Sequence, residues 1–530
     1  MAGTSIARKG HEAVVIGAGP NGLVAANLLI DAGWDVLLVE AQDHVGGGVY
    51  SDESVEPGFI HDTFSSFYPL AGASPVIKRL GLERHGLVWK HAPAVLGNPL
   101  PDGSWALLHR DVDRTARGLD AAHPGDGDAW RAVHADWQTI GPAILQALLS
   151  PFPPVRGGLK ALLKLPKVGG LDYVRTLLEP AATMGGKRFV GEGAQLLLAG
   201  NASHADIPMR ASGSGLLGLL LAMMGQTVGF PVPEGGAARL TQALADRFTS
   251  LGGEIRLNTA VSSISLAAGH ATGVVTDDGE HLPARAVVAD VAVSALYGGL
   301  VPWSALPPRT EEGMKRFEQD PATIKVDWAL SGPVPWANPP ETAPGTVHFA
   351  DSMDQLSQSQ DAIANHSVPA EPFLLAGQMT TSDATRSPAG TESMWAYTHV
   401  PQEVHRDEGP DGLTGSWDAD EIERMADRMQ ARIIKHAPDF ESRIITRRIL
   451  GPHQMQAMNA NLIKGALGGG TSGLHQQLIF RPIAGLGRAG TPIRGLFLGS
   501  ASAHPGGGVH GACGSNAARA VIAAARTGRL

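Results

Sequence analysis

Three glycines near the start of the chain, Gly17, Gly19 and Gly22, follow a short apolar run with the spacing G-x-G-x-x-G. In a unit of this kind the first glycine permits a tight turn, the second lets a pyrophosphate approach the backbone, and the third brings a helix close to the strand. A second apolar run at residues 36–39 ends in Glu40. A carboxylate at this place accepts hydrogen bonds from a ribose and repels a 2′-phosphate. The spacing therefore predicts a dinucleotide site.

The elements that hold these groups are a strand, a helix and a second strand. Residues 14–16 form an apolar run typical of a buried parallel strand, and residues 23–32 predict a helix. An isolated glycine motif is weak evidence in a chain with 67 glycines, whereas strand, turn, helix, strand and acidic residue in this order form a specific pattern. Gly46, Gly47 and Gly48 follow, and families that hold FAD as a fixed cofactor carry paired glycines at this place. We therefore expect FAD rather than NAD.

A second glycine-rich segment lies at the end of the chain. Residues 495–498 predict a strand, residues 499–508 a glycine-rich loop and residues 509–526 a helix. A helix that starts at Val509 would present free N–H groups and its positive dipole end, which stabilise the negative charge of a reduced flavin. A C-terminal packing helix after an ordinary glycine turn is the alternative.

Imidazoles flank this loop, and an imidazole is an acid–base group near neutral pH. His504 and His510 are therefore candidate catalytic residues, and His61, His204 and His475 are weaker candidates. The sequence contains no GxSxG, no HExxH and no paired metal-ligand spacing. We accordingly expect neither hydrolase chemistry nor a bound metal.

The composition indicates a chain that buries a large core, with 530 residues of which 43% are hydrophobic. Its net charge of −9 and the absence of a long basic run argue against nucleic acid as a partner. Cys513 is the only cysteine, which excludes an internal disulfide, and a small buried thiol is expected there rather than a covalent flavin link. The first ten residues lack the apolar segment of a signal peptide, so we expect a cytoplasmic location.

Long insertions separate the segments with nucleotide-binding patterns. We predict an α/β fold in which a Rossmann-like FAD-binding domain, assembled from discontinuous segments, carries an inserted α+β substrate-binding domain. The first insertion is mostly helical in pattern, and the second mixes strand-like runs with helix. The FAD-binding domain is assigned to residues 10–75, 231–300 and 490–530, and the substrate-binding domain to residues 76–230 and 301–489.

These motifs and the ending of the chain resemble the phytoene-desaturase-like flavoprotein superfamily. Arg481-Pro482, Thr491-Pro492-Ile493 and the run HPGGGVHG from His504 to Gly511 are most similar to carotenoid ketolases and to the pyridine nucleotide-disulphide oxidoreductase domain protein 2 branch. The resemblance implies non-covalent FAD in the Rossmann-like domain. It also implies a substrate domain that admits a long apolar molecule such as an isoprenoid.

The sequence departs from many of these relatives at two places. Gly48 stands where they carry Arg or Lys, and Ser500 stands where they carry an acidic residue. A hydroxyl bonds a ribityl or phosphate oxygen less strongly than a charged group does. Motifs and resemblance together predict these cofactor-binding residues: Gly17, Gly19, Pro20, Asn21, Gly22, Glu40, Ala41, Gly46, Gly47, Gly48, Val261, Gly499, Ser500, Gly507, Gly508 and Val509.

We expect an FAD-dependent oxidoreductase that transfers a hydride between the flavin and an extended apolar, isoprenoid or lipid-like substrate. A flavin amine oxidase is the first alternative; it needs an aromatic pair at the flavin face, and the chain has 28 Phe, Trp and Tyr residues. A non-catalytic prenyl or lipid carrier on the same fold is the second. Residues 159–168, LKALLKLPKV, are compatible with contact with a membrane surface and equally with an ordinary amphipathic helix. The sequence leaves the oligomeric state open.

Overall fold

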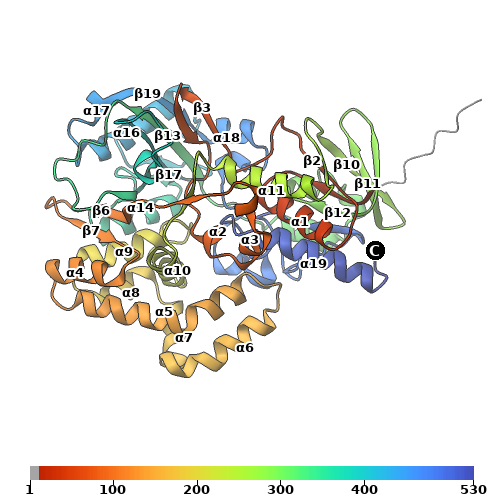
Figure 1. Cartoon of the computed structure of the whole chain (residues 1–530), viewed down its shortest axis with the longest axis horizontal. Coiled ribbons are helices and arrows are strands. Elements are labelled where there is room, and N and C mark those ends of the chain that lie inside the picture. Colours follow the sequence, from red (N-terminus) through yellow and green to blue (C-terminus); the bar gives the residue numbers. More distant parts are fainter. Residues whose placement is uncertain (1–10) are drawn as a thin grey trace, which may run out of the picture.

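The computed structural model describes residues 11–530 and contains two large sheets (Figure 1). The first sheet is built around the N-terminal strand. Its strands are β1 (His11–Ile16), β2 (Val36–Val39), β9 (Glu254–Arg256), β10 (Val261–Ala267), β11 (His270–Thr276), β12 (His281–Ala289) and β20 (Leu496–Leu498). They lie in the order β10-β11-β12-β1-β2-β9, with β20 also paired to β12. The pairs that join β9, β2, β1, β12 and β20 are parallel, and β10 to β12 form an antiparallel ribbon.

Helices α1 (Pro20–Asp31), α11 (Ala238–Ser250) and α19 (Ala512–Arg526) cover one face of this sheet. Ala13 and Val15 of β1 pack against these helices, whereas Val14 and Ile16 belong to the core on the opposite face. Strands that are apolar on both faces are typical of a parallel sheet between two layers. The topology confirms the predicted α/β fold, in which a Rossmann-like part is assembled from both ends and the middle of the chain.

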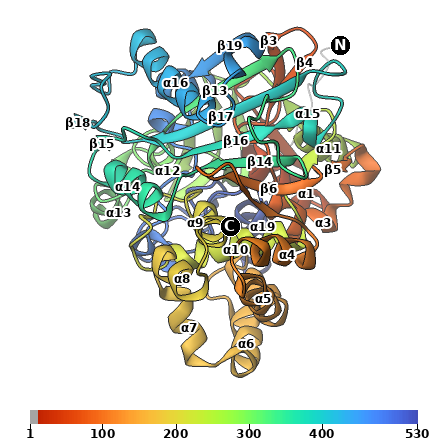
Figure 2. The ribbon, with the colours of Figure 1, turned by 90° about the vertical axis from the view of Figure 1, so that its left-hand side faces the viewer.

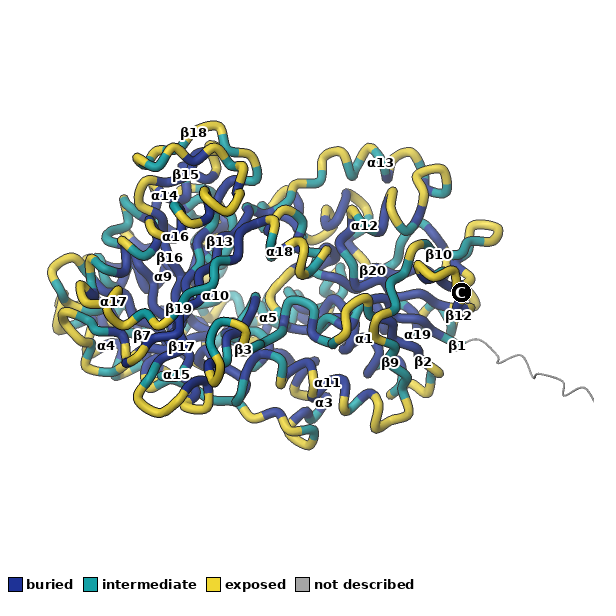
Figure 3. The backbone as a smooth tube through the Cα atoms, turned by 90° about the horizontal axis from the view of Figure 1, so that it is seen from above, coloured by how far each residue is buried: buried dark blue, intermediate teal, exposed yellow. Residues whose placement is uncertain are grey.

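The second large sheet is mostly antiparallel. Its order is β19-β13-β17-β16-β14-β6-β7, and its strands are β6 (Ala94–Pro99), β7 (Trp105–Leu108), β13 (Ala322–Leu330), β14 (Pro344–Phe349), β16 (Leu374–Gln378), β17 (Glu392–Val400) and β19 (Ile444–Leu450). Figure 3 shows that buried residues gather in two regions, one around each large sheet. Helix α16 (Ala419–Ile434) packs on the face that carries Val326 and Trp328. The opposite face, which we call the inner face, packs against α8 (Ala181–Arg188) and α9 (Glu192–Ala202) through Leu375 and Trp395.

A group of helices connects β7 to the ribbon of the first sheet. These are α4 (Val112–Ala122), α5 (Asp126–Leu148), α6 (Val155–Lys164), the 3₁₀ helix η2 (Leu165–Val168), α7 (Leu171–Leu178), α8 (Ala181–Arg188), α9 (Glu192–Ala202) and α10 (Ser214–Thr227). Residues 76–230 are thus mainly helical as predicted, but β6 and β7 leave this segment to join the second sheet. Helices α6 and α7 project at the foot of the molecule in Figures 1 and 2. Within residues 11–530, no helix has both the length and the apolar character needed to cross a bilayer.

The C-terminal helix begins later than the sequence predicts. It starts at Ala512, with Gly511 as its N-cap, and not at Val509. Val509 and Gly511 both have positive φ angles, +54° and +68°, and left-handed residues cannot continue an α-helix. The His510 side chain instead accepts the N–H of Ala512 through Nδ1 at 3.0 Å. The prediction that residues 1–10 carry no signal peptide lies outside the described residues.

Candidate cofactor-binding and active site

The N-terminal glycine loop is shaped by close backbone contacts that exclude a side chain. A Cβ at Gly22 would lie 2.0 Å from the carbonyl oxygen of Gly17, and Gly17 itself has a φ of +96°. Helix α1 starts directly after Gly19 with Pro20 at its first position, where a missing N–H costs nothing. The positive end of α1 therefore faces the loop, the arrangement that binds a pyrophosphate.

Glu40 stands beside this loop at the carboxyl end of β2. Its Oε2 accepts the N–H of Ala18 at 2.7 Å, so the acidic group and the glycine turn are held together. Thr259 donates its N–H to the Glu40 carbonyl at 2.7 Å, which places Val261, the first residue of β10, on the same side. Ala41 is exposed next to Glu40. These residues form the side of the site where a ribose would bind.

The paired glycines pack directly on the first loop. Gly46 donates its N–H to Ala18 O at 2.9 Å, and a Cβ at Gly47 would lie 3.1 Å from the Cα of Gly19. Gly48 is different, because a Cβ there would meet no atom within 4 Å. The position where relatives carry Arg or Lys thus has room for a side chain in this protein.

The C-terminal loop meets the N-terminal one through the starts of their helices. A Cβ at Gly514 of α19 would lie 1.9 Å from the carbonyl oxygen of Asn21, so the two helix ends are in contact. Gly499 follows β20 and donates to Ala289 O at 2.8 Å, and Ser500 is buried beside it. The structure therefore brings together the glycine-rich segments that lie almost a full chain length apart in sequence.

Free polar groups converge where these segments meet. The buried atoms Asn21 Oδ1, Ser515 Oγ and Asn516 Oδ1, all at the starts of α1 and α19, have no hydrogen-bond partner in the described part of the chain. The N–H groups of Gly507, Gly508 and Val509 donate no hydrogen bond within residues 11–530. Buried polar groups are rarely left unpaired, so the three side-chain atoms fit a polar cofactor such as FAD, and the N–H groups of the loop are free to bond it.

The two histidines proposed for catalysis lie beneath the C-terminal loop. His504 shares a hydrogen bond with Ser150 O through Nε2 at 3.1 Å, and its Nδ1 is buried without a partner among the described residues. Burial lowers the pKa of His504, and it lowers that of His510 to about 4. Both imidazoles are therefore neutral at pH 7. Their catalytic role stays a prediction.

The weaker histidine candidates are dispersed rather than brought together. His61 approaches Trp328 O at 3.1 Å, and His475 is exposed and pairs with Glu318. His204 lies next to His348, with their Nε2 atoms 3.2 Å apart. The three therefore share no common site.

The structure adds a buried lysine on the inner face of the second sheet. Lys325 forms a buried ion pair with Asp327 and donates to Asp62 O at 2.9 Å. Three residues beyond Asp62, Ser65 donates to Gly48 O at 2.7 Å, so this charged group adjoins the glycine segment. The signal was present in β13, where Lys325 and Asp327 alternate with apolar residues, but alternation alone does not tell which face meets the cofactor.

A buried acidic residue was also missed. Asp290 follows β12 and its Oδ2 accepts the N–H of Gly22 at 2.7 Å. Burial, with Glu40 adding repulsion and the Gly22 hydrogen bond opposing it, raises the pKa of Asp290 to about 7. No spacing in the sequence connects residue 290 with the glycine loop, because the contact spans 268 residues.

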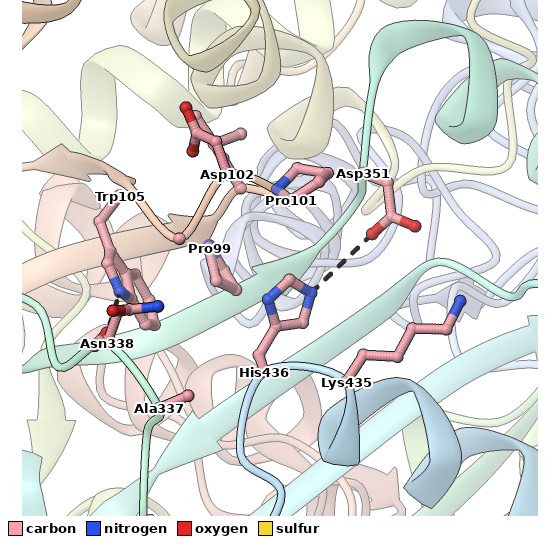
Figure 4. Close-up of a pocket in the computed structure, with 11 residues that line it drawn as sticks. Pro99, Pro101, Asp102, Trp105, Ala337, Asn338, Asp351, Lys435 and His436 are labelled. Atoms are coloured by element: carbon pink, nitrogen blue, oxygen red, sulfur yellow. Dashed lines mark hydrogen bonds and ion pairs between the residues drawn. The ribbon is translucent and has the colours of Figure 1, made fainter.

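A pocket of about 350 Å³ lies at the edge of the second sheet, and none of its lining residues belongs to the glycine segments (Figure 4). Its polar groups are already engaged: His436 Nε2 lies 3.9 Å from Asp351, Lys435 pairs with Glu371 at 2.6 Å, and Trp105 donates to Asn338 O at 2.7 Å. Nothing in this pocket requires a ligand.

Comparisons with known proteins agree with this site. The model of a family described as flavin containing amine oxidoreductase matches residues 21–336. Pyridine nucleotide-disulfide oxidoreductase domain-containing protein 2 of Rattus norvegicus is 26% identical, covering 97% of this chain and 93% of that protein. Phytoene desaturase of Fusarium fujikuroi is 26% identical, covering 94% and 86%. The structure of putrescine oxidase bound to putrescine has a TM-score of 0.59 at 16% identity, covering 97% and 99%, which shows a shared fold. The comparisons confirm the resemblance and FAD as cofactor.

Proposed function

Because the chain belongs to the flavin containing amine oxidoreductase family and is an FAD-dependent oxidoreductase, we propose that its substrate is an extended apolar molecule that reaches the flavin from a membrane surface. The substrate class is isoprenoid or another lipid-like chain. Full-length similarity to phytoene desaturases supports this class. The protein would then be cytoplasmic and bound to the membrane only at its surface.

FAD supplies hydride acceptor and donor chemistry when it is bound. The start of α1 and its glycine loop would hold the pyrophosphate, Glu40 would accept hydrogen bonds from the ribose hydroxyls, and the loop at Gly507–Gly508 would receive the flavin ring. All the proposed cofactor-binding residues fall within residues 10–75, 231–300 and 490–530, which supports the assignment of these segments to one FAD-binding domain. The remaining segments supply every strand of the second sheet and form the substrate domain.

An exposed apolar surface on α6, η2 and α7 is the observation that carries the membrane part of the proposal. We call residues 155–178 the apolar hairpin. Its exposed large side chains include Val155, Leu159, Leu162, Leu163, Leu171 and Leu178, and Leu171 is 82% exposed. The hairpin contains five basic residues and one acidic residue, although the whole chain has a net charge of −9. An apolar surface with surrounding Lys and Arg fits an anionic lipid bilayer.

The apolar hairpin is continuous with the proposed flavin loop. The chain that leads into α6 is held by His504, through Ser150 O, and by Arg488, which donates to Phe152 O at 3.1 Å. At its other end, Gly213 donates to Leu178 O at 3.0 Å and adjoins Leu474, which is 48% exposed. A membrane-bound hairpin would therefore hold the lipid phase next to the loop that receives the flavin.

Amine oxidation is the second candidate, and one observation favours it. Trp395 and Tyr397 stack on the inner face of the second sheet with ring centroids 5.8 Å apart, and the Lys325 ammonium lies 5.9 Å from the Trp395 ring. Aromatic faces attract cations, so this wall could receive an amine. The two rings come from one strand, however, and do not face each other across a gap.

Anaerobic reduction of the FAD-loaded protein separates the candidates. Acyclic isoprenoid polyenes presented in liposomes are expected to bleach the oxidised flavin spectrum, and aliphatic diamines or cyclic amines are expected to leave it unchanged. Bleaching by amines alone would replace the lipid substrate with an amine. A correctly folded protein that binds no FAD would overturn the whole proposal in favour of a carrier.

A further inference from the structure

The later start of α19 places the positive end of its helix dipole farther from the proposed flavin loop than a start at Val509 would. A helix dipole acts mainly within its first turn, and the first turn of α19 begins at Ala512 rather than at Val509. The loop itself still offers three unpaired N–H groups at Gly507, Gly508 and Val509. A full positive charge, the Arg481 guanidinium, lies beside this loop.

Arg481 is a fully buried guanidinium whose donors all go to backbone carbonyls. Its acceptors are Ala501 O at 2.8 Å, Thr471 O at 2.9 Å and Gly468 O at 3.0 Å, with longer contacts to Gly470 O. It forms no ion pair with any carboxylate of residues 11–530, and only 1% of its surface is exposed. Burial lowers the pKa of Arg481, and only the more distant Asp320 and Asp206 oppose this among the acidic side chains.

An unpaired buried charge is costly, so its retention needs a reason. The energetic cost of a charge in the protein interior is several kcal/mol unless another charge or strong hydrogen bonds compensate it. The other buried arginines of residues 11–530, Arg386, Arg428 and Arg432, each pair with carboxylates. The carbonyls that accept from Arg481 compensate the loss of solvation but do not neutralise its charge, so the interior keeps a net positive charge here that favours an anionic group close by.

The position of Arg481 indicates where such an anionic group would bind. A Cβ at Gly506 would be 3.4 Å from the Arg481 Cζ, and a Cβ at Gly507 would be 3.2 Å from Gly468 O, one of the acceptors of Arg481. The guanidinium thus lies directly behind the exposed Gly507–Gly508 backbone. Its donors are used within the protein, so it acts through its charge and by holding the loop.

We propose that Arg481 is a positioning residue whose charge, behind Gly506–Gly508, stabilises the anionic reduced form of bound FAD. This rests on the proposed flavin site. FAD bound here would supply the two-electron acceptor: a hydride from a substrate C–H bond would bring two electrons and one proton, and so would leave one negative charge on the cofactor. The substrate would lose the proton of a neighbouring C–H bond to water as its C=C bond forms. A fixed positive charge nearby favours the reduced state and makes the flavin a stronger oxidant.

Sulfite binding to the FAD-loaded protein tests this directly, because sulfite adds to the flavin and leaves the same negative charge on the ring. Arg481→Met is expected to weaken sulfite binding at least about tenfold, which corresponds to about 1.4 kcal/mol. Arg481→Lys keeps the charge and is expected to stay within about threefold of the wild type. Arg494→Met, at an exposed arginine thirteen residues further along the chain, serves as the matched control. Unchanged sulfite affinity in an FAD-loaded Arg481→Met protein would overturn the proposal.

A measurement on the wild type covers the case in which Arg481→Met does not fold or does not hold FAD. The two-electron reduction potential is followed across neutral pH. Uptake of one proton per two electrons shows that the reduced flavin stays anionic, as expected, and uptake of two protons contradicts the inference. A wild-type protein that binds no FAD would refute the proposed function instead, so the two failures are distinguishable.

Discussion

The carboxylate of Asp290 accepts the backbone N–H of Gly22 at 2.7 Å, so a buried acid at the end of β12 holds the turn that opens the dinucleotide site. The same Oδ2 would lie 3.0 Å from a Cβ at Gly19. The two negative groups near this turn, Asp290 and Glu40, thus flank the place where the pyrophosphate would bind. This arrangement makes cofactor binding sensitive to the protonation of Asp290.

Asp290→Asn is expected to stabilise the apoprotein above neutral pH. The pKa of Asp290 is raised to about 7 in the folded state, so between about pH 4 and pH 7 the folded protein holds a proton that the unfolded chain has released. The stability of the folded protein therefore falls as the pH rises through this window. Above the window the full loss of stability from ionising the buried Asp290 is reached. Since Asn keeps an oxygen acceptor for Gly22, the variant should match the wild type at acid pH and gain on the order of 2–4 kcal/mol at pH 8.

Thermal unfolding across this pH range measures the effect. Asp172→Asn, a change at an exposed residue, keeps Asp290 and should follow the wild-type unfolding temperature at every pH. Fluorescence titration of FAD adds a second readout: wild-type affinity should fall above pH 7, and the variant's affinity should not. Equal unfolding temperatures at pH 8 would show that Asp290 is not the group responsible.

Gly22→Ala is expected to abolish FAD binding. The new Cβ would lie 2.0 Å from Gly17 O, and this backbone contact cannot be relieved without moving the loop from α1. Gly118→Ala is the matched control, since Gly118 lies inside α4 and a Cβ there meets no atom within 4 Å. That control should bind FAD normally and gain roughly 0.5–1 kcal/mol of stability, because alanine is the better helix former. Flavin absorbance after gel filtration reports binding for both.

Glu40→Ala is expected to weaken FAD binding by about 10- to 100-fold, since a hydrogen bond to a charged group contributes roughly 1.5–3 kcal/mol. Glu40→Gln keeps one oxygen acceptor, and its FAD affinity should lie between that of Glu40→Ala and that of the wild type. Isothermal titration of the apoprotein gives the affinities. An FAD affinity that does not change in Glu40→Ala would place the ribose elsewhere.

Replacing Leu162 and Leu163 together by Glu is expected to abolish binding to anionic vesicles. The two leucines are 64% and 69% exposed in α6, and each apolar side chain moved out of water contributes on the order of 1.5–3 kcal/mol. Leu251→Glu, at an exposed leucine after α11, is the control and should leave binding unchanged. Flotation with vesicles of mixed phosphatidylserine and phosphatidylcholine provides the measurement. Vesicles of phosphatidylcholine alone test how much the anionic lipid contributes. Wild-type protein that does not float with the mixed vesicles would refute the proposed membrane binding.

Local sequence patterns were enough to predict the N-terminal part of the proposed cofactor site. Gly17, Gly19, Gly22 and Glu40 lie within one strand–helix–strand unit, and their spacing fixes their arrangement because short-range backbone geometry leaves few alternatives. The α/β class followed from the same local patterns. The start of α19 could not be predicted in this way, because the left-handed backbone at Val509 and Gly511 depends on what the loop packs against.

The residues that complete the proposed site from distant parts of the chain could be found only in the folded structure. Asp290 reaches Gly22 across 268 residues, Lys325 reaches the glycine segment through Asp62, and Arg481 lies behind Gly506 without a carboxylate partner in residues 11–530. Such contacts are set by how strands and loops pack across the core, and by which charges burial leaves without compensation. The spacing of residues in the sequence does not indicate this packing or these charges, because burial and long-range pairing arise only when the whole chain has folded.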